Sequence, residues 1–135
     1  MAIRYSKRIL LVDNDESMLD VLTIVLKGCG YKLLVARDGL EAMRSVQEQE
    51  PDLIIMELML PVLDGPRLLR WLRGQQDSTL PVMVLTALDR SAAQDTVAGL
   101  GVDELIYKPV GRSELVKRVR KMLPVAPVAR VAAAG

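Results

Sequence analysis

The chain has 135 residues, of which half are hydrophobic and 26% are charged, as expected for one globular domain. It contains no histidine, which excludes imidazole bases, Ser-His and Cys-His triads and histidine-ligated metals. The 18 basic and 17 acidic residues nearly balance, which argues against nucleic-acid binding through this chain. Cys29 is the only cysteine, so no internal disulfide can form, and no apolar run could span a membrane. We therefore predict a soluble, cytoplasmic domain.

Five short apolar segments, rich in β-branched residues, have the length of strands. They cover residues 9–12, 33–36, 53–56, 82–85 and 105–107. Each segment is continuously apolar instead of alternating with polar residues, which indicates strands that are covered on both faces.

Segments of helical length follow each predicted strand, and each has start signals. The predicted first residues or caps are Asp15, Asp38 (with Glu41 three residues later), Asp64 (with Pro66), Ser91 (with Gln94) and Gly111 (with Glu114). We expect the first helix to end near residues 28–30 and the second to stop at Pro51. The residues expected to face the core are Met18, Leu22, Val25, Cys29, Leu68, Leu69, Leu72, Ala93, Val97, Leu100, Leu115, Val119 and Met122.

Alternating strands and helices favour parallel strand pairing through right-handed crossovers, and hence a doubly wound α/β sandwich. Residues 1–123 form the predicted domain. Residues 124–135 are rich in proline, alanine and valine without helical or strand periodicity, and we predict a flexible tail or a truncated linker there.

Polar side chains follow four of the predicted strands at the edge where ligands bind in parallel sheets. They are Asp13, Asn14 and Asp15, then Glu57, Thr86 and Lys108. Carboxylate oxygens suit Mg²⁺, and a hydroxyl with an ammonium suits phosphoryl oxygens. Taken singly, the acids could be an ordinary polar loop and Thr86 an ordinary strand residue, but their joint placement predicts a cation and phosphoryl pocket. A buried Glu57 would need a partner, and Lys108 is the natural one.

The segments ILLVDNDE, PDLIIMELMLPVLDG, VLTA and GVDELIYKP resemble the signature segments of receiver domains of two-component response regulators. The resemblance covers residues 7–123 and implies a (βα)₅ flavodoxin-like fold with strand order 2-1-3-4-5. It implies that Asp13 and Asn14 occupy the acidic pair that helps to bind Mg²⁺. It also places Glu57 where an aspartate accepts a phosphoryl group from a kinase histidine, with Thr86 and Lys108 as the residues that stabilise the phosphorylated form.

Further expectations come with the same resemblance. The acidic metal pocket would comprise Asp13, Asn14, Glu57 and Met59, and Leu105 would occupy the switch position. The Lys108–Pro109 bond is a candidate for a cis peptide. Partners, namely a histidine kinase, an output protein or a second copy, would dock on the face made by the fourth helix, the fifth strand and the fifth helix.

Three residues depart from the family pattern: Glu57 replaces aspartate, Asn14 replaces an acid and Leu105 replaces an aromatic residue or histidine. The extra methylene of Glu57 moves its carboxylate by about 1.5 Å at most. A misplacement of about 1 Å can slow in-line transfer on the order of 10²-fold. Asn14 removes a negative charge, so Mg²⁺ binding is possible but weakened. We therefore hypothesise a degenerate, phosphorylation-independent receiver in phosphorelay signalling that is a protein-interaction module and no enzyme.

Two alternatives stay open at this point. The receiver could still be phosphorylated slowly on Glu57 with Mg²⁺. A flavodoxin-like nucleotide or flavin binder would need a glycine-rich phosphate loop, whereas acidic residues follow the first strand here.

The surface of the predicted helices carries many basic residues. The fifth helix has Arg112, Lys117, Arg118, Arg120 and Lys121 against Glu114 alone. A solvated face is one interpretation, and contact with an acidic partner or a second copy is the other. We expect Arg67, Arg70 and Arg73 on the third helix to be solvated, and Trp71 beside them to be partly buried.

Overall fold

The structure is a computed structural model that describes residues 6–76 and 79–125, and within them five parallel strands form a single sheet. The strands are β1 (Arg8–Val12), β2 (Lys32–Ala36), β3 (Leu53–Met56), β4 (Val82–Thr86) and β5 (Glu104–Tyr107). Their order is β2-β1-β3-β4-β5, which confirms the predicted topology. Each predicted strand agrees with an observed one to within a residue at either end. The predicted tail falls mostly outside the described residues.

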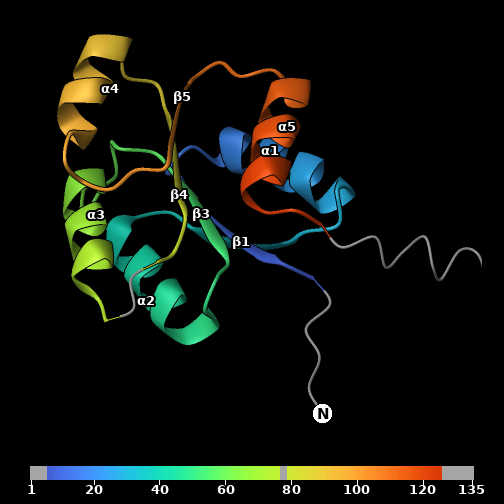
Figure 1. Cartoon of the computed structure of the whole chain (residues 1–135), viewed down its shortest axis with the longest axis horizontal. Coiled ribbons are helices and arrows are strands. Elements are labelled where there is room, and N and C mark those ends of the chain that lie inside the picture. The colour runs from blue at the N-terminus through green and yellow to red at the C-terminus, as the bar shows by residue number, and fades with distance from the viewer. Residues whose placement is uncertain (1–5, 77–78, 126–135) are drawn as a thin grey trace, which may run out of the picture.

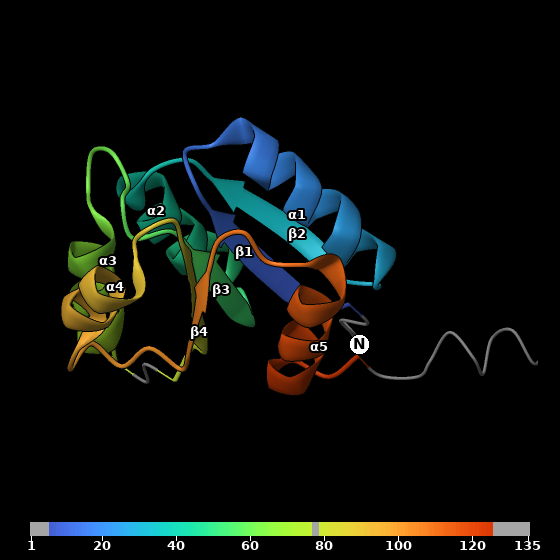
Figure 2. The ribbon, with the colours of Figure 1, turned by 90° about the horizontal axis from the view of Figure 1, so that it is seen from above.

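The helices form a layer on each face of the sheet (Figures 1 and 2). They are α1 (Glu16–Gly28), α2 (Gly39–Gln49), α3 (Gly65–Gly74), α4 (Arg90–Val97) and α5 (Arg112–Met122). Helices α1 and α5 cover one face, and α2, α3 and α4 cover the other (Figure 2). None of the described helices has the length and hydropathy that crossing a membrane would require.

Two apolar clusters fill the spaces between the sheet and these layers. Alternate residues of β1 enter opposite clusters. Ile9 and Leu11 belong to the cluster beneath α1 and α5 (the α1–α5 core), and Leu10 and Val12 belong to the cluster beneath α2, α3 and α4 (the α2–α4 cluster). Most residues predicted to face the core are buried; Met18, Cys29, Val97, Leu100 and Met122 are only partly buried. Trp71 is half-buried against the α2–α4 cluster, as predicted.

Aspartate side chains cap most of the helices. Asp15, Asp38 and Asp64 cap α1, α2 and α3 as predicted, by accepting hydrogen bonds from amides of the first turn. The prediction of Ser91 as the start of α4 is wrong, because Asp89 accepts from the Ala92 amide at 2.8 Å. A charged carboxylate at this position also interacts favourably with the helix dipole, and Ser91 then lies inside the first turn.

The loop between β3 and α3 is held by close backbone approach to two glycines. A Cβ atom on Gly39 would lie 2.0 Å from the Leu63 carbonyl oxygen, and one on Gly65 would lie 2.6 Å from the Leu58 backbone. The Gly65 amide also donates to the Leu58 carbonyl at 2.8 Å. Within this loop Val62 adopts a φ of 69°, which is rare for a β-branched residue, and its side chain is exposed. The two glycines thus fix where the residues that follow β3 lie.

Candidate functional site

The strand register brings the predicted polar residues to one edge of the sheet. Val12 pairs with Met56, so Asp13 and Glu57 leave their strands side by side. Thr86 pairs with Tyr107, so Lys108, the residue after Tyr107, leaves β5 at the same edge of the sheet where Thr86 ends β4. The side chains of Asp13, Glu57 and Thr86 are buried at 4%, 4% and 0% exposure, so each needs partners within the protein.

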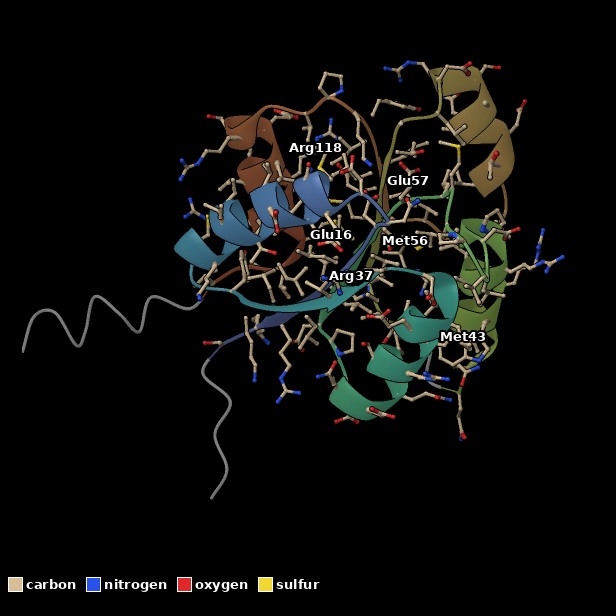
Figure 3. The ribbon with its side chains drawn as sticks, turned by 180° about the vertical axis from the view of Figure 1, so that it is seen from behind. Glu16, Arg37, Met43, Met56, Glu57 and Arg118 are labelled. Atoms are coloured by element: carbon tan, nitrogen blue, oxygen red, sulfur yellow. The ribbon has the colours of Figure 1, made fainter. Side chains whose placement is uncertain are left out.

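The carboxylate of Glu57 accepts hydrogen bonds from five donors at this edge; Figure 3 labels its position. Its Oε1 atom accepts from the Leu58 amide at 2.7 Å, the Met59 amide at 3.4 Å and the Thr86 hydroxyl, and its Oε2 atom accepts from the Ala87 amide at 3.0 Å and the Lys108 ammonium at 3.1 Å. Both oxygens are therefore fully engaged with groups of the chain itself.

Lys108 bridges the two buried carboxylates. Its Nζ atom lies 2.7 Å from Asp13 Oδ2 and 3.1 Å from Glu57 Oε2. The other oxygen of Asp13 accepts from the Asp15 amide at 2.9 Å. The Lys108–Pro109 peptide bond that follows is cis. One ammonium thus serves two carboxylates, which leaves the cluster with a net negative charge.

The cluster shifts the protonation equilibria of its members in opposite directions. Burial alone would raise the pKa of Glu57, but hydrogen bonds from Thr86, Ala87, Leu58 and Lys108 outweigh it and lower that pKa below its usual value. Burial alone would lower the pKa of Lys108, but its bonds to Asp13 and Glu57 outweigh burial and raise it. The charged forms of both residues are therefore favoured at neutral pH.

These two shifts predict a loss of stability at each end of the pH range. The contribution of Glu57 is complete above the ordinary carboxyl pKa of about 4.3 and is lost as the pH falls through its lowered value. The contribution of Lys108 is complete below about pH 10.4 and is lost as the pH rises through its raised value. Urea unfolding followed by Trp71 fluorescence should show both losses. Subtracting the profile of Glu57→Gln isolates the acid loss, and identical acid profiles would contradict the lowered pKa.

The side chains of three predicted site residues lie apart from this cluster. Asn14 is exposed and lines a cavity of about 500 Å³ between the β3–α3 loop and α4. The Met59 side chain lines the same cavity and is 51% exposed, so this residue reaches Glu57 only through its amide. Leu105 is half-buried in the α2–α4 cluster. Beside it the Arg90 guanidinium lies 4.4 Å from the centre of the Tyr107 ring, a contact that the sequence did not indicate.

The oxygen atoms at this edge of the sheet are the ligands that a divalent cation would need. Mg²⁺ needs several oxygen ligands in near-octahedral geometry. Asp13 Oδ2 and Glu57 Oε2 both accept hydrogen bonds from the Lys108 ammonium. Across residues 6–76 and 79–125, no three acidic, cysteine or histidine side chains gather as metal ligands. In this arrangement the Lys108 ammonium occupies the position between the two carboxylates, so a divalent cation that bound both of these oxygens would have to displace it.

Two arginines predicted from the sequence to be surface residues have defined partners. The prediction that Arg73 is solvated is wrong, since it donates to the carbonyls of Gly101 and Leu80 at 2.6 and 2.9 Å. Arg118 on α5 pairs with Glu104 at 2.7 Å and Glu114 at 2.8 Å. Glu16 and Arg37 also form an exposed ion pair near the site (Figure 3). None of these partners is local enough in the sequence to be predicted, apart from Glu114.

Comparison with known proteins gives the same family as the motifs. Residues 9–120 match the model of the response regulator receiver domain. The chain belongs to this family. The receiver domain is 44% identical over 119 residues to the DNA-binding response regulator MtrA of Mycobacterium tuberculosis. That alignment covers 87% of this chain and 50% of MtrA, so the chain spans about half the length of the curated relatives it matches.

Solved receiver domains have the same fold. One belongs to a signal transduction histidine kinase of Syntrophus aciditrophicus, with a TM-score of 0.81 and 34% identity over 87% of this chain and 90% of that one. Another is the receiver domain of sensor histidine kinase PA1611 from Pseudomonas aeruginosa, described with a magnesium ion coordinated in its active-site cleft. It has a TM-score of 0.81 and 30% identity over 87% of this chain and 97% of that one. The chain is thus a receiver domain of two-component signalling.

Proposed function

We propose that this receiver domain is a phosphorylation-independent, non-enzymatic protein-interaction module in which Glu57 stands at the phospho-acceptor position. The observation that carries the proposal is the set of five donors on the Glu57 carboxylate. Thr86, Lys108 and the nearby amides are the groups that would stabilise phosphoryl oxygens. Glu57 already holds these donors, so a phosphoryl group would have to displace its own acceptor from them.

The same contacts supply part of what phosphorylation would supply. The longer glutamate side chain reaches Thr86 and Lys108 directly and orders both. The imitation is incomplete, since a carboxylate has two oxygens and one charge, whereas a phosphoryl group has three oxygens and a charge of about −1.5 to −2. Leu105 has no hydroxyl with which to exchange hydrogen-bond partners. We therefore propose a domain held in one state instead of a switch between two.

The proposed partners are proteins that dock on the face formed by α4, β5 and α5, as an output protein, a kinase or a second copy would. On this face Arg90 covers the Tyr107 ring, and Arg118 joins β5 to α5 through Glu104. These contacts order the side chains before a partner arrives, which lowers the entropic cost of binding. Transcriptional output, as in the DNA-binding relatives, would have to act through another domain or protein.

Phosphorylation is tested by incubating the protein with Mg²⁺ and acetyl phosphate and measuring its intact mass. We expect no phosphoryl-sized increase, because the acceptor is displaced and its oxygens are occupied. The matched control is Glu57→Asp, which restores the shorter acceptor and leaves Asn14 in place, and for which we expect partial modification. A stoichiometric, base-labile adduct on Glu57 would refute the proposal and establish the slowly phosphorylated receiver in its place.

A further inference from the structure

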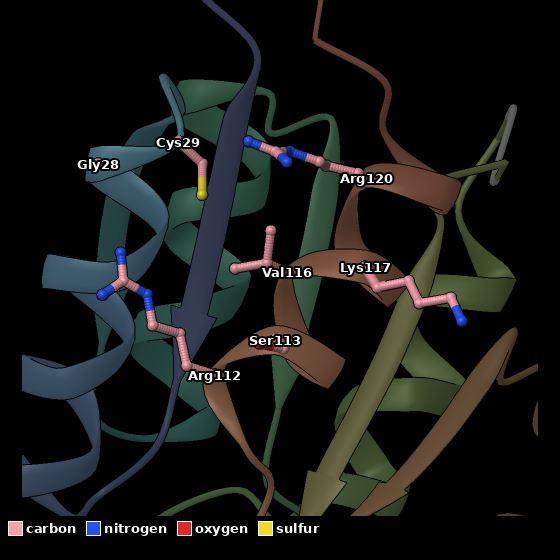
Figure 4. A pocket seen from close by; sticks show the side chains of 7 residues that line it. All are labelled: Gly28, Cys29, Arg112, Ser113, Val116, Lys117 and Arg120. Atoms are coloured by element: carbon pink, nitrogen blue, oxygen red, sulfur yellow. The ribbon is translucent and has the colours of Figure 1, made fainter.

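A cleft between α5 and the end of α1 lies apart from the Glu57 site. It has a volume of about 610 Å³ and is lined by Gly28, Cys29, Arg112, Ser113, Val116, Lys117 and Arg120 (Figure 4). On α5, Arg112, Val116 and Arg120 are spaced four residues apart and so share one stripe of the helix. Figure 4 shows Arg112 and Arg120 flanking Val116, with the Cys29 thiol opposite.

The charge of the cleft is of one sign. Three of its lining residues are basic and none is acidic. Within the described part of the chain, Arg112, Lys117 and Arg120 form no ion pair, whereas Arg118 on the adjacent stripe is neutralised by Glu104 and Glu114. Arg112 and Arg120 are therefore available to a partner on the side of α5 that faces α1, whereas Lys117 also lines a pocket with Glu104 and Glu114 on the β5 side.

The floor of the cleft is apolar. Val116 and Cys29 are half-buried there and pack against the α1–α5 core. On α1, Val21 and Ile24 fall on the same face as Gly28 by helical spacing, and they are 55% and 72% exposed. An apolar strip bordered by cations is the pattern that an amphipathic helix with acidic flanks would complement.

We propose that this α1–α5 cleft binds an acidic amphipathic helix of a partner protein. Arg112 and Arg120 are eight residues apart on α5, a rise of about 12 Å. Two carboxylates seven or eight residues apart on the incoming helix would match this spacing. An aliphatic residue midway between them would meet Val116 and Cys29. The cleft is separate from the Glu57 site, so this proposal stands whether or not the domain is phosphorylated.

The probe is a synthetic helical peptide with glutamates seven residues apart and leucines between them, titrated into the full chain. We expect binding that protects Cys29, the only thiol of the chain, from alkylation. The double variant Arg112→Glu/Arg120→Glu should lower the affinity for the peptide by about tenfold or more. Arg44→Glu/Arg70→Glu makes the same change of charge at exposed sites on α2 and α3 and should change the affinity by less than about twofold. Circular dichroism checks that both variants fold.

Several results would overturn the proposal. One is an equal loss of peptide affinity in the two double variants, since that would mean that the overall charge of the protein, and not the cleft, attracts the peptide. A second is equal binding of a peptide of the same composition with its glutamates placed side by side. A third is protection of Cys29 by duplex DNA but not by the acidic peptide, which would assign the cleft to nucleic acid. Self-association that masks Cys29 without any peptide would assign it to a second copy of the chain.

Discussion

Replacing Lys108 with methionine should lower the free energy of unfolding by about 3 kcal/mol at neutral pH. The ammonium lies 2.7 Å from Asp13 and 3.1 Å from Glu57, and both carboxylates are almost fully buried. Methionine preserves much of the volume of the aliphatic stem but leaves two buried carboxylates without a counter-charge. Because the lysine side chain is 14% exposed, the expected destabilisation is at the low end of the range for removing one partner of a buried ion pair. Urea unfolding followed by Trp71 fluorescence measures the loss.

A double-mutant cycle and a pH series separate this charge effect from lost packing. The double variant Glu57→Gln/Lys108→Met should lose less free energy of unfolding than the sum of the two single variants. With a neutral glutamine at position 57, removal of the lysine leaves no unpaired charge there. The loss from Lys108→Met should also shrink as the pH falls through the carboxyl range, since protonated carboxyl groups need no cation. Additive effects and a loss independent of pH would together show that Lys108 acts only by packing.

Gly39→Ala should destabilise the protein by about 3 kcal/mol through a collision of backbone with side chain. The added Cβ would lie 2.0 Å from the Leu63 carbonyl oxygen, and no rotation of a flexible side chain can relieve that contact. The β3–α3 loop must therefore shift away from α2. Because the same loop supplies the Leu58 and Met59 amides to Glu57, amide NMR signals at the Glu57 site should move as well.

Gly74→Ala is the matched control for this substitution. Gly74 ends α3, and an added Cβ there meets no atom within 4 Å. Alanine also has the higher helix propensity, so this variant should be unchanged or more stable by about 0.5–1 kcal/mol. If Gly39→Ala were as stable as Gly74→Ala in chemical denaturation, the close approach of the loop to α2 would be wrong.

The fold was predictable from the sequence because its signals are local. Uninterrupted apolar segments such as residues 53–56 mark strands covered on both faces, and aspartates such as Asp38 and Asp64 mark helix starts. The error at α4 arose where two capping residues, Asp89 and Ser91, lie two positions apart. Local pattern could not decide between them, and the observed cap is the charged side chain.

The candidate site was predictable only in its side chains. Asp13, Glu57, Thr86 and Lys108 could be grouped because parallel strands bring their carboxyl ends to one edge. The amides of Leu58, Met59 and Ala87 could not be predicted, since every residue but proline carries an amide and only loop geometry aims it. Arg73 escaped prediction for the same reason, because its partners are mainly backbone carbonyls.

The carboxylate that fills the donor set is tethered to the chain itself. An intramolecular ligand has an effective concentration at its site that dilution does not change, and no hydrolysis removes it. Under the proposed function, output therefore follows mass action between the partner and the number of copies of this chain. A cell would adjust such a signal through synthesis and degradation of the protein, on the timescale of minutes to generations, and not through the lifetime of a phosphoryl bond.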